Sequence, residues 1–288
     1  MINGNEAQPP LDIIHVDSEA VAWSTGDREL FAIYVNEALN FFPLISSNLV
    51  DLPSQSTIKE IGSGIGLLSL LVAQRGYNVV AFEPESAGFS LMRQFHSTVR
   101  SAWRHGPVSV SWFDSEYPAA GDQERADFVY AVNVIEHVPQ WRDLVSNIMM
   151  REEPHVKLRL IFPNYVYPYE PHFQSPTLFS KRLTKLIMSR KFRNTWIRDP
   201  EQFWEDLSWP TGTQVMKHCK NMGYSCAFSN EAFLSYLERS QNDESFRQRK
   251  GRIFNGLVRV VFPILTSFSN WIPKRFLPVI DVTITKKL

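Results

Sequence analysis

The sequence predicts an α/β protein with a Rossmann-like, seven-stranded, mostly parallel sheet, helices on both faces, and an insertion or cap on the substrate side. Two observations support this prediction. Short apolar segments with strand patterning alternate with segments of helical spacing over residues 57–288. A glycine-rich turn, Gly62 to Gly66, joins the first predicted strand directly to an apolar helix, which is the context of a cofactor-binding loop.

The first strand is predicted to end at the glycine turn, and the helix after it has a continuous buried side. The apolar residues of that side are Leu67, Leu68, Leu70, Leu71 and Val72. Gly76 follows at the position where a helix C-terminus favours glycine. Glycines in the turn allow the backbone to approach a ligand that side chains would exclude.

The residues around the turn distinguish two classes of ligand. A dinucleotide-binding turn has a third glycine where this chain has Leu67, and it lies against a doubly negative pyrophosphate. The carboxylate of Glu60 would repel that group, whereas it attracts a ligand that carries an ammonium and a sulfonium. The sequence therefore favours S-adenosylmethionine, and an NAD-dependent oxidoreductase is the weaker hypothesis.

Polar residues end the strands that follow. The predicted strand 77–83 ends at Glu83, where a carboxylate can accept from both ribose hydroxyls. The segment 127–138 is an apolar strand that stops in polar residues, among them Asn133. Ligands of open α/β sheets bind at the carboxyl ends of the strands. We therefore predict that these side chains share one site.

The strand predicted over 108–113 is followed by a residue that could bind adenine. Asp114 follows it directly and can accept from an adenine amino group. Asp122 and Glu116 are alternatives that a shift of the loop would bring into the same place.

Three motifs in this order resemble those of a class I S-adenosylmethionine-dependent methyltransferase, of the type-11-like group that includes the ubiquinone-pathway O-methyltransferases. They are E-I-G-S-G-I-G from Glu60, V-V-A-F-E ending at Glu83, and D-F-V-Y-A-V-N-V-I-E-H-V from Asp127, within residues 57–165. The resemblance implies that the cofactor contacts Glu60, Gly62, Ser63, Gly64, Gly66, Glu83, Pro84, Asp114 and Asn133. It implies that the glycine turn lines the methionine and ribose, that Glu83 holds the ribose, and that Asn133 lies beside the methionine.

Methyl transfer to a hydroxyl or amine requires one proton acceptor, and the candidates cluster in residues 163–173. His172 has a pKa suited to accepting a proton near neutrality, and Glu170 is predicted to orient it or to bind the substrate. His137 is the second candidate. Two alternatives remain open: the 163–173 segment is a rigid loop that packs on the insertion, or the Glu136-His137 pair caps the next helix.

Hydrophobic periodicity and chain breakers predict the remaining elements. They are one or two helices over 27–49 interrupted at Pro43, helices over 140–150, 180–192 and 211–221, and strands over 156–162, 224–229 and 279–286.

The domain prediction has two parts. Residues 1–56 form an N-terminal tail and cover helices, and residues 57–288 form the main domain with insertions at 164–210 and 231–278. We expect both insertions to close over the acceptor side of the sheet. Their apolar side chains are expected to need the core as a partner.

Composition excludes several function classes. Thirty basic residues balance thirty acidic ones without long basic runs, so no nucleic-acid partner is expected. Cys219 and Cys226 lack metal-ligand spacing, and no metal site is predicted. With a polar, non-signal-like segment 1–10, the sequence suggests a cytoplasmic protein. Apolar residues in 252–275 fit helices packed on the sheet or on another subunit, and also a peripheral contact with the inner membrane face.

The function that these features predict is S-adenosylmethionine-dependent methyl transfer to a hydroxyl or amine of a small molecule or glycan. The aromatic residues of 163–210 suit stacking on a sugar or an aromatic ring. The alternative is a non-catalytic protein of the same fold that binds or scaffolds a partner. Retention of Glu60 and Glu83 beside the glycine turn favours the enzyme.

Overall fold

The computed structural model describes most of the chain. The described residues are 23–84, 91–103, 108–173, 175–178, 180–192, 197, 199–242 and 271–287. The tail predicted over residues 1–10, and most of the apolar segment 252–275, lie outside them.

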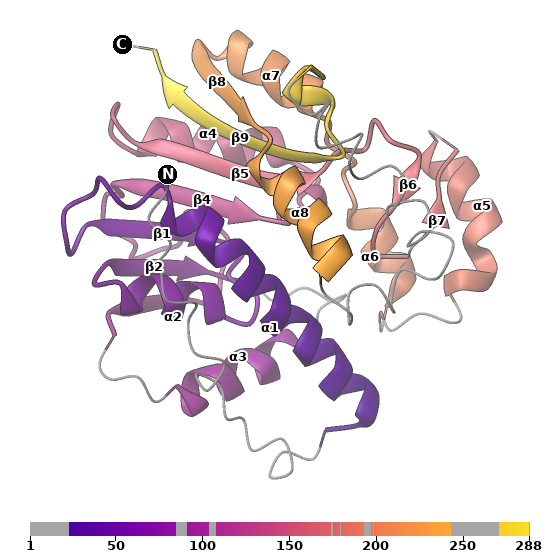
Figure 1. The fold of residues 1–288 in the computed structure, drawn as a ribbon, viewed down its shortest axis with the longest axis horizontal. Helices are drawn as coiled ribbons and strands as arrows, with labels where there is room; N and C mark the ends of the chain where they lie inside the picture. The colour runs from indigo at the N-terminus through magenta and orange to yellow at the C-terminus, as the bar shows by residue number, and fades with distance from the viewer. Residues whose placement is uncertain are drawn as a thin grey trace.

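A seven-stranded sheet forms the centre of the molecule, in the order β3-β2-β1-β4-β5-β9-β8 (Figure 1). The strands are β1 (Thr57–Ile61), β2 (Asn78–Phe82), β3 (Val110–Phe113), β4 (Phe128–Val132), β5 (Lys157–Pro163), β8 (Tyr224–Ser229) and β9 (Val279–Lys286). Strands β1 to β5 pair in parallel, and β9 pairs antiparallel with both β5 and β8. The predicted mostly parallel, seven-stranded sheet is confirmed.

The strand order reverses beside β1. The chain moves outward from β1 to β2 and β3, and then crosses to β4 on the other side of β1. At such a switch point the loops after the two central strands diverge, which makes a crevice at their carboxyl ends. Here the loop after β1 is the glycine turn, and the loop after β4 carries Asn133 to His137.

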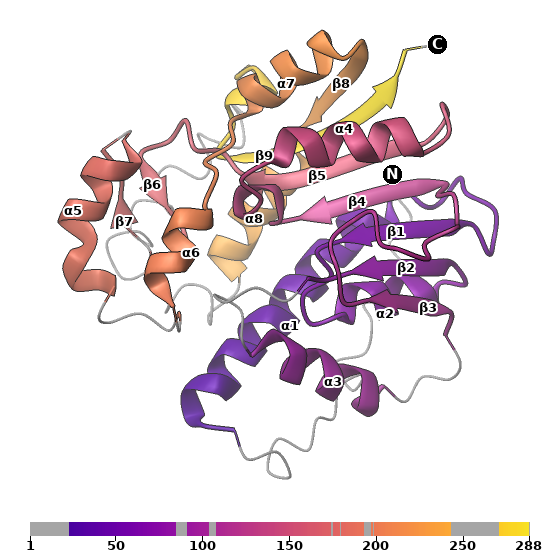
Figure 2. The ribbon, with the colours of Figure 1, turned by 180° about the vertical axis from the view of Figure 1, so that it is seen from behind.

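Helices cover both faces of the sheet (Figures 1 and 2). One face carries α1 (Thr25–Ser46), α2 (Leu67–Gln74), α3 (Met92–Ala102) and α8 (Glu231–Asn242), and the other carries α4 (Trp141–Arg151) and α7 (Gly212–Asn221). Apolar side chains fill the space on each side, for example Phe95 on the first face and Trp141 on the second. The central strands are therefore buried on both faces, as their apolar runs require. None of the described helices combines the length and apolarity that a membrane span needs.

Helix α1 is one continuous helix, so the predicted interruption at Pro43 is wrong. Proline lacks the N–H that would donate to the carbonyl of Leu39, so one helical hydrogen bond is lost. Pro43 nevertheless lies in the last turn, where only three helical residues follow it. The N–H of Ser47 closes the helix on the carbonyl of Pro43 at 3.1 Å. At the other end, Ser24 and Asp27 form a capping box.

The first insertion forms a small lobe beyond the carboxyl ends of β4 and β5 (Figures 1 and 2). Its elements are β6 (Tyr169–Glu170), β7 (Ser175–Pro176), α5 (Lys181–Phe192) and α6 (Pro200–Asp206). The lobe has a buried apolar cluster of its own, which consists of Phe173, Met188, Ile197, Phe203, Trp204 and Leu207. The aromatic rings of this cluster pack on one another, with Phe173 and Trp204 at 5.7 Å between ring centroids, and Phe203 also contacts the ring of His137 in the loop after β4. That the insertion needs the core as a partner stays a prediction.

The end of the lobe is attached to the loop after β4. The N–H of Ser208 donates to the carbonyl of Glu136 at 2.7 Å, and its hydroxyl donates to the carbonyl of Ile135 at 2.8 Å. The lobe therefore has a defined position against the carboxyl edge of the sheet. In the second insertion, the structure describes α8 and a short 3-10 helix, Lys274–Phe276.

Candidate functional site

The glycine turn after β1 is built from three left-handed residues: Gly62, Gly64 and Gly66 have φ of 74°, 54° and 77°. A Cβ atom at Gly62 would lie 2.4 Å from Cγ2 of Val134, and one at Gly66 would lie 2.7 Å from Cδ2 of His96. At Gly64 the nearest atom would be 3.8 Å away. Gly62 and Gly66 therefore make room for the protein's own side chains, whereas a Cβ atom at Gly64 would make only an ordinary van der Waals contact, with Sδ of Met92.

This difference predicts two distinct phenotypes. Either alanine places a side chain in the left-handed region, at a cost of about 1–2 kcal/mol. Gly62→Ala also overlaps Val134, so it should lower the melting temperature more than Gly64→Ala does, and Val134→Ala in the same chain should restore part of the loss. Gly64→Ala should instead weaken S-adenosylhomocysteine binding at least about tenfold, which calorimetry measures. Unchanged affinity in Gly64→Ala would mean that the ligand does not contact the turn there.

Glu60 and Ser63 have buried polar atoms next to the glycine turn. Glu60, on β1, is 3% exposed and accepts a hydrogen bond from the Ser69 hydroxyl of α2. Burial raises the pKa of Glu60 to about 8, against the Ser69 hydrogen bond, which lowers it. The Ser63 hydroxyl is buried and has no hydrogen-bond partner among the described residues. Such an atom suits contact with a bound ligand.

Glu83 stands at the end of β2, where its Oε2 accepts the N–H of Gly64 at 2.7 Å. Burial raises the pKa of Glu83 to about 7, against that hydrogen bond. Burial and the charges of Glu37 and Glu83 raise the pKa of Tyr34 on α1, so this side chain senses the Glu83 carboxylate. The half-buried Pro84 follows. Helix α1 therefore reaches the predicted cofactor site, which its sequence did not indicate.

The two remaining predicted cofactor residues end their strands as expected. Asp114 is exposed after β3 and lies near His96, whose pKa burial lowers to about 4 while the Asp114 charge opposes the change. Asn133 follows β4 with a left-handed φ of 54°, a conformation that asparagine tolerates better than most residues. Of the alternatives to Asp114, Asp122 is committed to a buried ion pair with Lys59 at 2.9 Å, and Glu116 is exposed.

A second group of polar side chains lies where the lobe meets the loop after β4. Glu170, fully buried on β6, accepts three hydrogen bonds. The donors are Nδ1 of His172 at 2.7 Å, the hydroxyl of Tyr165 at 3.2 Å and the N–H of Phe173 at 2.6 Å. The carboxylate is thus held in one orientation and orients the His172 imidazole in turn. The loop is therefore more than a rigid Tyr/Pro connection.

His137 comes to the same place from a 3-10 turn, Ile135–His137. The centroid of its ring lies 4.7 Å from that of His172, and the ring centroid of Phe203 lies 5.1 Å from each of these two centroids. The alternative that Glu136 and His137 cap the next helix is wrong, because α4 has Gln140 at its N-cap and no side-chain cap. The structure therefore brings together all three residues that were predicted to be catalytic.

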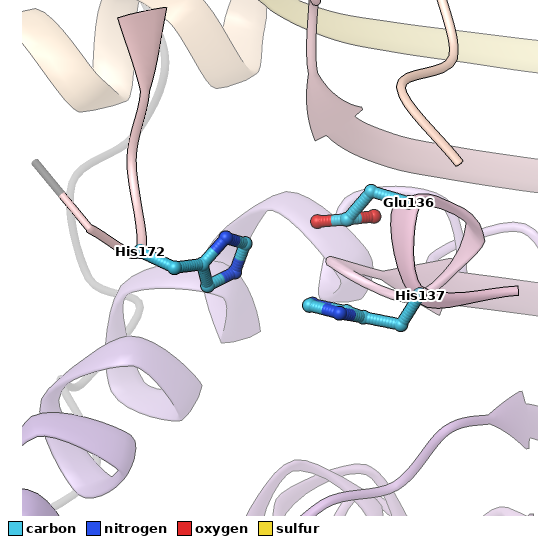
Figure 3. Close-up of side chains that lie close together, drawn as sticks. All are labelled: Glu136, His137 and His172. Carbon is cyan, nitrogen blue, oxygen red and sulfur yellow. The ribbon is translucent and has the colours of Figure 1, made fainter. Parts of the chain in front are cut away.

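Glu136 completes the group and was not among the predicted site residues. Its side chain points toward His137 and His172 (Figure 3). It is fully buried, and neither carboxylate oxygen has a hydrogen-bond partner in the described part of the chain. One ligand atom from each of the three residues lies within 4.8 Å of the others. The signal in the sequence was a carboxylate next to a histidine, directly after an apolar strand.

The environment gives the three side chains different protonation behaviour. Burial raises the pKa of Glu136 to about 8, and the charge of His172 lowers it only in part. Burial, together with the charge of His172, holds the pKa of His137 well below 6.5. Burial also lowers the pKa of His172, but the Glu170 carboxylate outweighs it and raises that pKa above 6.5. His172 is therefore the stronger base of the two histidines.

The two groups belong to one site. Val134, between Asn133 and the 3-10 turn, is the residue that fills the space beside Gly62. Glu37 of α1 is near both groups, since its charge raises the pKa of Glu136, His172 and Tyr34. The loops after β1 and β4 and one face of α1 therefore surround a common region at the carboxyl edge of the sheet.

Comparisons with known proteins identify the family of the chain. A family model described as "Methyltransferase domain" matches residues 34–224. The uncharacterized protein Rv1509 of Mycobacterium tuberculosis is 29% identical over 246 residues, which cover 84% of this chain and 83% of the relative.

Solved structures show a similar fold at low sequence identity. One is a putative S-adenosylmethionine dependent methyltransferase from Listeria monocytogenes, with a TM-score of 0.50, 12% identity, and coverage of 88% of this chain and 99% of that chain. Another is the cyclopropane synthase MmaA2 from Mycobacterium tuberculosis, with a TM-score of 0.47, 14% identity, and coverage of 82% and 80%.

Proposed function

The chain belongs to the methyltransferase-domain family, and we propose that it transfers the methyl group of S-adenosylmethionine to a hydroxyl or amine of a small molecule or glycan. The observation that carries the proposal is the Glu170–His172 pair, which stands at the same edge of the sheet as the glycine turn.

The residues around the turn suit this cofactor. No side chain packs tightly against the backbone of Gly64, and the Ser63 hydroxyl is buried without a partner among the described residues. The carboxylate of Glu60 would attract the sulfonium and ammonium groups of the ligand, and that of Glu83 would accept hydrogen bonds from the ribose hydroxyls. When bound, S-adenosylmethionine supplies a methyl group that the sulfonium has already activated.

On the acceptor side, His172 takes the proton. With the proton of its Nδ1 donated to Glu170 at 2.7 Å, Nε2 carries the lone pair that can accept from a hydroxyl or amine. The Glu170 carboxylate then stabilises the imidazolium that results. Phe203 and the lobe exclude water from the acceptor, which keeps its nucleophilic atom desolvated.

A non-catalytic binding protein of the same fold is the second candidate. It would keep the cofactor site without any need for a base. The buried Glu170, which three donors hold in place, argues against it, because a binding surface has no use for an oriented imidazole.

Ligand binding is the first test of the proposal. Calorimetry on the purified full chain should show binding of S-adenosylmethionine and S-adenosylhomocysteine. Release of S-adenosylhomocysteine in the presence of a panel of glycans and small hydroxyl and amine compounds should then identify the acceptor. Tight binding of NADH, with no response to either adenosyl ligand, would overturn the proposal.

Cofactor affinity should rise with pH. Burial raises the pKa of Glu83 to about 7 and that of Glu60 to about 8, so both carboxyls are largely neutral at pH 6 and ionised at pH 9. Because the sulfonium ligand is attracted only by the ionised forms, its affinity should increase about tenfold over this range. S-adenosylhomocysteine lacks the sulfonium charge and should respond less. Titration calorimetry at several pH values measures both, and affinity that falls with pH would contradict the prediction.

A further inference from the structure

We propose that Glu136, His137 and His172 form a binding site for a divalent first-row transition metal ion. The three side chains come from two segments, the 3-10 turn after β4 and the loop after β6, and they point toward one another (Figure 3). Their ligand atoms lie within 4.8 Å of one another. Ligand atoms around one bound ion are about 3–3.5 Å apart, so we expect binding to draw the two segments together slightly.

The unsatisfied carboxylate of Glu136 is the first argument. Both oxygens are buried with no hydrogen-bond partner among the described residues, and the side chain is fully buried. A buried carboxylate without partners is costly, and in native proteins it is paired or coordinates a metal. A cation between Glu136 and the two imidazoles would supply the missing partner.

The orientation of His172 is the second argument. Histidines that ligate metals usually donate their other ring N–H to a carboxylate or carbonyl, which fixes the tautomer. Here Nδ1 of His172 is 2.7 Å from Oε1 of Glu170, which leaves Nε2 for an ion. Glu170 itself accepts from the Tyr165 hydroxyl and from the N–H of Phe173, so the carboxylate that orients His172 is fixed in place.

The donor set selects the class of ion. Two imidazole nitrogens and one carboxylate oxygen suit Mn²⁺, Fe²⁺, Co²⁺ or Zn²⁺, whereas Mg²⁺ and Ca²⁺ prefer sites made of oxygen atoms. Three protein ligands leave coordination positions open. An ion held in this way would act as a Lewis acid toward a ligand that occupies those positions.

The role of the ion in the reaction rests on the proposed function. An acceptor hydroxyl, with a neighbouring oxygen atom, would occupy the open positions next to the cofactor site. The positive charge would lower the pKa of the hydroxyl, and its proton would pass to bulk water as the acceptor enters the site. The bound oxygen would then take the methyl group as the methyl–sulfur bond breaks and S-adenosylhomocysteine is left. In the metal-loaded chain the lone pair of His172 is thus used for the ion, and in the metal-free chain it is available for the proton.

Binding of Co²⁺ tests the site directly. The full chain, without a histidine tag and stripped with a chelator, should bind one equivalent of Co²⁺ with visible absorption bands, and Zn²⁺ should displace it. Glu136→Gln keeps the shape of the side chain and should weaken Co²⁺ binding at least about 100-fold, as should His137→Ala. Glu170→Gln should weaken it about 10–100-fold through the orientation of His172.

His155→Ala is the matched control, since His155 is exposed in the turn after α4 and should not matter. S-adenosylhomocysteine affinity shows that each variant is folded. If Co²⁺ does not bind, or binds equally well to Glu136→Gln and to the unaltered chain, the metal site is refuted.

The two proposals fail separately. Methyl transfer that persists in excess chelator would refute the role of the ion while the proposed function stands. Stoichiometric Co²⁺ binding by a chain that binds no adenosyl ligand would refute the proposed function while the metal site stands.

Discussion

Turnover should fall at least about 100-fold when His172 is replaced by alanine, while the affinity for S-adenosylhomocysteine changes less than about twofold. The loss is that of a positioned proton acceptor or metal ligand, and it leaves the glycine turn untouched. The measurement is the rate of S-adenosylhomocysteine release at saturating cofactor, with the acceptor that the panel identifies.

Two further variants separate the roles in this group. Glu170→Gln keeps the shape of the side chain but removes the charge that orients and raises the pKa of His172, so its loss should be smaller than that of His172→Ala. His155→Ala should keep full activity, as a surface histidine outside the site. If His172→Ala remains fully active while His137→Ala is inactive, the proton acceptor is His137.

Affinity for both adenosyl ligands should fall sharply in Glu83→Ala. The substitution removes two charge-assisted hydrogen bonds to the ribose, at a cost on the order of 2–4 kcal/mol, or roughly 30- to 1000-fold in the dissociation constant. The measurement belongs at pH 8.5, because burial raises the pKa of Glu83 to about 7 and the carboxyl must be ionised to show its full effect.

Glu116→Ala is the control for this prediction, since Glu116 is an exposed carboxylate that follows the neighbouring strand β3. It should leave affinity unchanged. An equal loss in both variants would point to a general effect of negative charge, and an unchanged Glu83→Ala would move the ribose contact elsewhere.

The sequence predicted the sheet because its elements are encoded locally. Strand patterning, the glycine turn and the helix stop at Gly76 each act within a few residues, and their order allows few topologies. The predicted interruption at Pro43 failed for a local reason. Helix α1 continues through this proline because Pro43 lies in the last turn, where little of the helix follows it.

The predicted site residues followed from one rule, that ligands of such sheets bind at the carboxyl ends of the strands. That rule places Glu83, Asp114 and Asn133 at one edge without any knowledge of distances. It also favoured His172, which follows the fifth strand. It says nothing about which of two histidines is the stronger base, because that depends on which carboxylate lies against each ring.

By itself, the sequence determined the fold, the polar residues that follow the strands, and the class of cofactor. These depend on periodicity and on residues adjacent in the chain. Only the tertiary structure decided which glycine of the turn lacks a tight contact with the protein's own side chains, and that α1 flanks the site. It alone joined Glu136 and His137 to His172, which stands 35 residues later in the printed sequence. Burial and pairing of charges arise from contacts between distant segments, so the protonation of these groups and their fitness to hold an ion appear only once the chain is folded.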